Sequence, residues 1–223
     1  MKLNKRNCPI NIELDAIGAD MLDISMDICG KHYDFSASSV MGHQFGAFLY
    51  AIYGMYWEAP GERRYFKNSY PKIECDLRTK IIRAQIRWDS EGYITTIMLT
   101  RRFHDFSVPS PTEKDNIEIT INQRDKYIVD ARDLCYAVAK ASTDAMKKYG
   151  FYGYNLTCGA DCNGYGDSID IERLLFIKAY ALNAMEARET KELFKHPDYL
   201  DDDFNDATFS SFEKEIEILL FDM

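Results

Sequence analysis

The hydrophobic pattern of this chain changes its period near residue 130, and that change most constrains the fold. Before residue 130, apolar residues alternate with polar ones in short runs, which is typical of strands with one buried face. After residue 130, apolar residues recur three and four positions apart, as in amphipathic helices. A chain in which strands come first and helices follow is typical of α+β folds. We therefore predict a single α+β domain over residues 1–223, strand-rich over 1–129, helical over 130–195, with an acidic tail over 196–223.

The strand-rich part contains three groups of alternating segments. Residues 10–16, 21–29 and 32–38 form the first group, and Gly30-Lys31 predicts a hairpin turn between the last two segments. Residues 82–88 and 93–101 predict a second hairpin, and 117–121 with 127–129 a third pair. Together these segments predict an antiparallel sheet within residues ~9–129.

Helical spacing first occurs over residues ~39–57, where Ser38 or Ser39 is suited to cap a helix that packs on the sheet. The C-terminal helical part, ~130–221, predicts helices at 130–149, 169–188 and 209–221. Asp130 is expected to cap the first of these helices, and Gly150 to end it.

The sequence contains no run of about 18 apolar residues that could cross a membrane, and its N-terminus lacks the apolar segment of a secretory signal. We therefore expect a cytoplasmic protein without a membrane segment. Its six cysteines are then expected to be free thiols.

Charge is concentrated at the C-terminal end. Residues 196–223 hold nine acids and one lysine, so this stretch carries −8 of the net charge of −9. Such an asymmetry argues against duplex nucleic acid as the ligand, because phosphate contacts require clustered lysine and arginine. It favours a basic protein partner, and a tail that only keeps the protein soluble is the alternative. The residues expected to contact the partner are Asp198, Asp201, Asp202, Asp203 and Asp206.

The main basic feature consists of Arg83 and Arg87 together with Arg101 and Arg102. If Arg83 and Arg87 lie on the outer face of a strand, they form a positive stripe that the acidic tail could contact within the same molecule. The alternative is a solvated sheet face, where ion pairs contribute little.

Residues 161–172 fit the spacing of a calcium-binding loop, which offers oxygen ligands around a glycine turn. Tyr165 and Ser168 depart from that pattern, because the first lacks a carboxylate or amide and the second replaces an aliphatic residue. The alternative is a helix start near residue 169 that is capped by acidic and hydroxyl side chains. Under the first interpretation, the ligands for Ca²⁺ are Asp161, Asn163, Asp167 and Glu172.

No phosphate-binding glycine motif and no metal-ligand pair with established spacing occurs in the sequence, so it indicates no catalytic residue and no other cofactor. The sequence therefore favours a non-enzymatic protein-binding module, of the immunity or antitoxin type, that inhibits a basic protein. One alternative is a calcium-binding structural protein that uses residues 161–172. Another is an enzyme of unknown reaction that uses the glycine-rich loop 150–168. Its candidate residues are Cys158, Asp161, Asp167 and His43.

Overall fold

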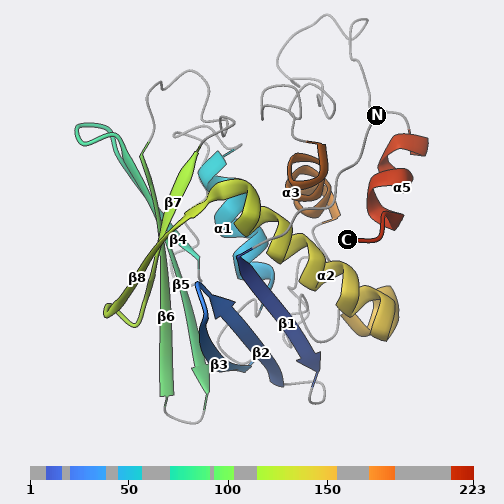
Figure 1. Ribbon diagram of the computed structural model, residues 1–223, viewed down its shortest axis with the longest axis horizontal. Helices are drawn as coiled ribbons and strands as arrows, with labels where there is room; N and C mark the ends of the chain where they lie inside the picture. Colours follow the sequence, from blue (N-terminus) through green and yellow to red (C-terminus); the bar gives the residue numbers. More distant parts are fainter. Residues whose placement is uncertain are drawn as a thin grey trace, which may run out of the picture.

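The computed structural model describes residues 9–16, 21–38, 45–56, 71–90, 93–102, 115–154, 171–183 and 212–223 (Figure 1). These residues form an α+β fold with two antiparallel sheets. The three-stranded sheet has the order β1-β2-β3, with β1 at Ile10–Ala16, β2 at Met21–Ile28 and β3 at Lys31–Ser38. The five-stranded sheet has the order β4-β5-β6-β7-β8, with β4 at Lys72–Asp76, β5 at Ile81–Ser90, β6 at Tyr93–Arg102, β7 at Asn116–Ile121 and β8 at Asp125–Asp130.

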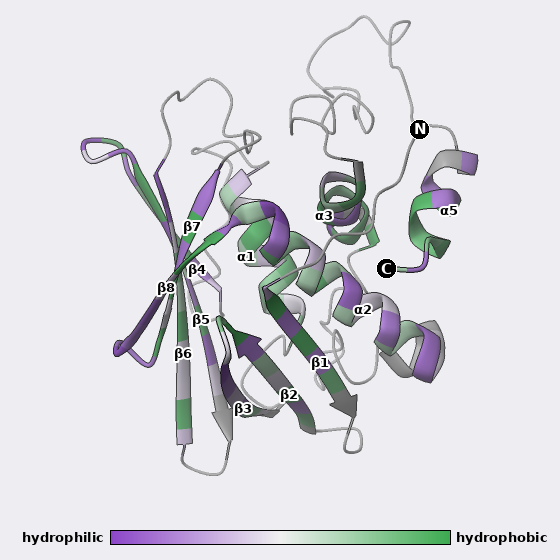
Figure 2. Ribbon diagram, viewed as in Figure 1, coloured by the Kyte–Doolittle hydropathy of each residue, from purple (hydrophilic) through white to green (hydrophobic). Residues whose placement is uncertain are grey.

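The predicted strands and hairpins are confirmed, since alternation places one side of each strand in the core. Ile10 and Ile12 of β1 and Ile24 and Met26 of β2 are each at most 2% exposed, and Figure 2 shows hydrophobic and hydrophilic residues alternating along these strands. Gly30 turns the chain between β2 and β3 with a positive φ of 81°, which glycine adopts without steric cost. Two findings differ from the prediction: there are two sheets in place of one, and β4 is an additional strand.

Aromatic side chains join the two sheets into one core. The centroid of the Phe35 ring of β3 lies 5.6 Å from that of the Trp88 ring of β5. The Phe48 ring, from the helix that follows β3, also contacts Trp88, with 5.4 Å between the ring centroids. Tyr33 and Tyr127 share a hydrogen bond of 2.5 Å between their hydroxyls, which connects β3 to β8. The strand β3 therefore crosses the inner face of the five-stranded sheet.

The described part of the chain contains four helices, two of which pack directly on the sheets. The four helices are α1 (Gly46–Tyr56), α2 (Ala131–Tyr154), α3 (Ile171–Asn183) and α5 (Phe212–Leu220). The helix α1 packs on β4 and β5, α2 packs on β1, and α3 packs on both α1 and α2. Figure 1 shows α5 on the far side of the molecule from the five-stranded sheet, where it contacts α3.

The helix ends test several predictions. Asp130 caps α2, because its Oδ1 accepts a hydrogen bond of 2.8 Å from the amide of Arg132. Gly150 interrupts this helix with a φ of 72°, as expected of a glycine at a helix break, although four further residues are helical. The prediction that Ser38 caps α1 is wrong, since Ser38 is the last residue of β3. The predicted alternative cap, Ser39, lies outside the described residues.

The helix α3 is the centre of the helical layer. Every residue from Leu174 to Leu182 is buried, so α3 packs against neighbours on all sides. Two apolar residues of the last two helices are not buried. Ile171 is 39% exposed at the start of α3, and Leu220 of α5 is 72% exposed, whereas Ile218 is buried.

One arginine of the predicted basic feature is a core residue. Arg101 is 3% exposed, and its guanidinium donates hydrogen bonds to Asp115 at 2.7 and 2.8 Å and to the Met55 carbonyl at 3.0 Å. It also lies 4.1 Å above the centre of the Tyr56 ring. A buried charge needs such partners, and Arg101 thereby ties β6 to the end of α1 and the start of β7.

Among the described helices, none combines the length and the apolar character needed to cross a membrane.

Candidate protein-binding surface

The outer face of the three-stranded sheet carries acidic side chains from all three strands. The antiparallel register places Asn11, Asp27 and His32 in one row across the sheet, and Glu13, Ser25 and Asp34 in the next. The third row joins the backbone of Asp15 to Asp23 and Ser36. We call this surface the acidic face and define it by its described side chains: Asn11, Glu13, Asp23, Ser25, Asp27, His32, Asp34 and Ser36.

Short polar side chains hold several of these carboxylates in place. Ser36 donates a hydrogen bond of 2.6 Å to Asp23, and Ser25 donates one of 3.0 Å to Asp34. Asn11 donates one of 3.0 Å to Glu13. Each ionised carboxylate has about four acceptor positions, so one or two donors orient the group and leave capacity for a partner.

His32 is the one residue on the acidic face that can carry positive charge. Its Nδ1 lies 2.8 Å from Asp27 Oδ1, and its Nε2 lies 3.0 Å from Asp34 Oδ1. Because ionised carboxylates only accept hydrogen bonds, the ring satisfies both contacts when both of its nitrogens are protonated. The hydrogen bond to Asp27 and the charge of Asp34 raise the pKa of His32.

The acidic face is therefore a surface of nearly one sign. Its described side chains comprise four carboxylates and one histidine, with neither lysine nor arginine. Lys31 of β3 instead pairs with Asp125 of the five-stranded sheet, at 2.8 Å. A surface of one sign attracts an oppositely charged protein and speeds its association.

The outer face of the five-stranded sheet has a different character. The predicted stripe is present, since Arg83 and Arg87 lie opposite the buried side of β5. However, acids are interleaved with it: the register places Glu74 beside Arg83, and Glu118 pairs with Lys126 at 3.4 Å. This face fits a solvated surface of mixed charge.

The predicted site residues lie mainly outside the described residues. This applies to the calcium-loop residues Asp161, Asn163 and Asp167 and to the acidic tail residues Asp198, Asp201, Asp202, Asp203 and Asp206. It also applies to Cys158 and His43, two residues of the enzyme hypothesis. The backbone of Glu172 lies in the first turn of α3.

Within the described segments, no group of three or more histidine, cysteine, aspartate or glutamate residues is arranged to hold a metal ion.

The acidic face could not be recognised from the local sequence pattern because its members are separated along the chain. Glu13, Asp23 and Asp34 lie on three different strands, and only the register brings them together. A usable signal existed, since the polar positions of the predicted hairpin strands are mostly acids or serines. Assigning those positions to one face would have identified the surface.

The fold and this surface define an α+β protein in which a helical layer backs two antiparallel sheets, one of them presenting a carboxylate-rich face. Comparisons with protein-family models, with curated proteins and with solved structures each found no match.

Proposed function

We propose that this protein is a non-enzymatic binding module that docks a basic protein through the acidic face, in the manner of an immunity or antitoxin protein. The observation that supports the proposal is the acidic face itself, with Glu13, Asp23, Asp27 and Asp34 on one side of a rigid sheet. A one-sign surface repels itself and lowers stability, so a surface with no binding role has no need of it.

The rigidity of the acidic face favours recognition over a merely solubilising role. Its carboxylates are oriented by serine, asparagine and histidine donors, as in the contact of 2.6 Å from Ser36 to Asp23. Groups that are already ordered lose less conformational entropy on binding. The predicted acidic tail, which includes Asp198 and Asp206, has the same charge and suits the same class of partner.

The test is a binding measurement with the basic proteins encoded beside the gene for this chain. Each is purified and titrated into the protein in a calorimeter at physiological salt. We expect one of them to form a 1:1 complex with submicromolar affinity, and its activity to be inhibited in the complex. The proposal is contradicted if none binds, or if binding is unchanged when Asp23 and Asp34 are both replaced by lysine.

A further inference from the structure

The buried helix α3 contains one charged residue in its core stretch. From Leu174 to Leu182 the only charged side chain is Lys178, and it is 0% exposed. An ammonium group inside a protein is stable only when polar groups replace its water. The hydrogen-bond partners of Lys178 therefore indicate its structural role.

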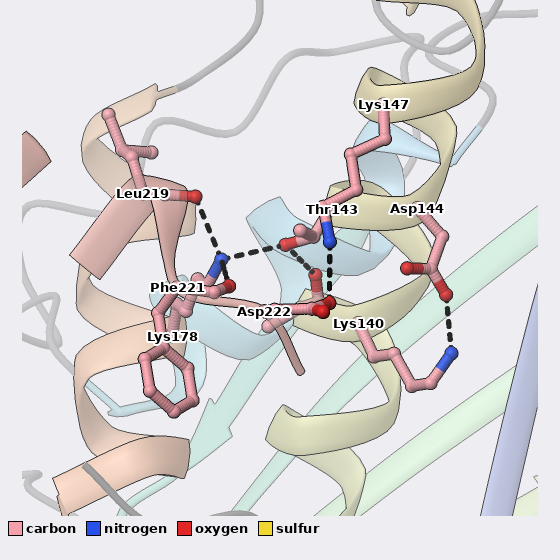
Figure 3. A network of polar contacts seen from close by, with 9 residues as sticks. Lys140, Thr143, Asp144, Lys147, Lys178, Leu219, Phe221 and Asp222 are labelled. Carbon is pink, nitrogen blue, oxygen red and sulfur yellow. Dashed lines mark hydrogen bonds and ion pairs between the residues drawn. The ribbon is translucent and has the colours of Figure 1, made fainter. Parts of the chain in front are cut away.

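The ammonium of Lys178 donates three hydrogen bonds of 2.9 Å, to Thr143 Oγ1 and to the carbonyls of Leu219 and Phe221 (Figure 3). Thr143 uses its own hydroxyl hydrogen in a bond of 2.8 Å to the Ala139 carbonyl, so it can only accept from Lys178. All three partners are then acceptors, and they match the three donors of an ammonium group.

Two of these three acceptors lie at the C-terminal end of the last helix, α5: Leu219 is in its final turn, and Phe221 follows its last residue. The final carbonyls of a helix have no partner within that helix, and a cation near them also interacts favourably with the helix dipole. Leu219 and Phe221 flank Leu220, where α5 ends. Lys178 thus supplies the C-terminal cap of α5 from a different helix.

The helix α5 depends on such outside support. It has nine residues, and an isolated helix of fewer than about 12 is marginal in water. A further contact just after this helix, 2.5 Å from Asp222 to Lys147, is between exposed side chains and contributes little. Among the described side chains of 212–223, only Ile218 and Met223 are buried.

Burying the ammonium group of Lys178 has an electrostatic cost. Burial lowers the pKa of Lys178 to about 8, and Lys147 acts in the same direction, whereas Asp144 and Asp222 act against it. Lys178 therefore contributes to the docking of α5 only the difference between this desolvation cost and its three hydrogen bonds, in addition to the burial of Ile218 and Met223.

We infer that α5 and the residues after it form a latch, helical only while docked, which Lys178 anchors and which opens as a unit while the rest of the fold stays closed. Opening uncovers Lys178 and the side of α3 that faces α5. This inference concerns the helical layer and does not depend on the proposed function of the acidic face.

Hydrogen exchange followed by mass spectrometry tests the latch on the full chain. In the wild-type protein, we expect amides of 212–223 to exchange faster than those of 174–182, with little dependence on denaturant, as for local opening. Lys178→Met should speed exchange of 212–223 by about tenfold or more, because buried carbonyls lose their donors. Thr143→Val, which keeps Lys178 and both carbonyl contacts, should give a smaller increase.

Lys140→Met is the matched control, since Lys140 lies on the same helix as Thr143 and pairs with Asp144. It should leave exchange of 212–223 unchanged. The latch is overturned if wild-type 212–223 exchanges only through global unfolding, or if Lys178→Met leaves its exchange unaltered. If Lys178→Met fails to fold, the wild-type denaturant series and Thr143→Val decide the question alone.

Discussion

The two sheets share one core but present opposite kinds of outer surface. On the five-stranded sheet, acids and bases alternate across strands, as in the pair formed by Glu118 and Lys126. On the three-stranded sheet, carboxylates occur without lysine or arginine among the described outward side chains, and His32 is the one residue among these side chains that can carry positive charge. The same alternating pattern builds both sheets, so the difference comes from the choice of outward residues. Solvated surfaces usually mix both signs of charge, as the five-stranded sheet does, whereas the acidic face carries nearly one sign.

The largest expected effect tests whether the two sheets belong to one cooperative unit. Trp88 is 4% exposed and contacts Phe35 and Phe48. Trp88→Ala should lower the free energy of unfolding by about 3–5 kcal/mol, because it leaves a cavity where the sheets meet. Urea denaturation measures this loss, and hydrogen exchange should show β2 and β6 losing protection together.

The matched control is Tyr93→Ala, at a side chain that is 83% exposed, and it should change the free energy of unfolding by less than about 0.5 kcal/mol. If β2 keeps its protection while β6 loses it in Trp88→Ala, the sheets are separate units and the comparison between their faces no longer concerns one domain.

A smaller effect tests the cost of the one-sign surface. Asp23 is one of the four described carboxylates of the acidic face. Asp23→Asn should raise the melting temperature by about 1–3 °C at low salt, because it removes one of the like charges that repel each other on this surface. The rise should shrink at high salt, where charges are screened.

On the five-stranded sheet, Glu118→Gln should give no such rise, since it removes a partner of Lys126. An equal increase for both substitutions, measured by differential scanning calorimetry, would show that the two faces do not differ in electrostatic strain.

The smallest effect concerns His32, whose pKa is raised in the folded protein by Asp27 and Asp34. A raised pKa stabilises the fold fully below the unfolded value of about 6.5, and this stabilisation is lost as the pH rises through the folded pKa. The melting temperature of wild type minus that of His32→Gln should therefore be larger at pH 5.5 than at pH 8.5. A difference that does not vary with pH would contradict the ionic role of His32.

Much of the fold could be predicted from the sequence because burial imposes a period on it. Alternating isoleucines such as Ile117, Ile119 and Ile121 identified β7, and Asp130 identified the start of α2. The strand β4 was missed because its five residues have a single strongly apolar member, Ile73, too few to show a period.

The positions of charges in space could not be predicted in the same way. Arg101 has the same sequence character as Arg102, yet Arg101 is buried against Asp115 while Arg102 is exposed. Lys178 interrupts an apolar helix, and its position is explained by its hydrogen bond to the end of α5, which lies about 40 residues further along the chain. Net charge was also a poor guide to the surface, because residues 1–195 sum to nearly zero while one sheet in that region is acidic.

The most direct test of the central claim is the rate at which the basic partner associates with two variants of equal net charge. One replaces Asp23 and Asp34 of the acidic face by lysine, and the other replaces Glu74 and Glu118 of the five-stranded sheet by lysine. Stopped-flow measurement should show the first variant associating about tenfold or more slowly than wild type at low salt, with the second within about twofold. Equal slowing of both variants would mean that overall charge, and not the acidic face, attracts the partner.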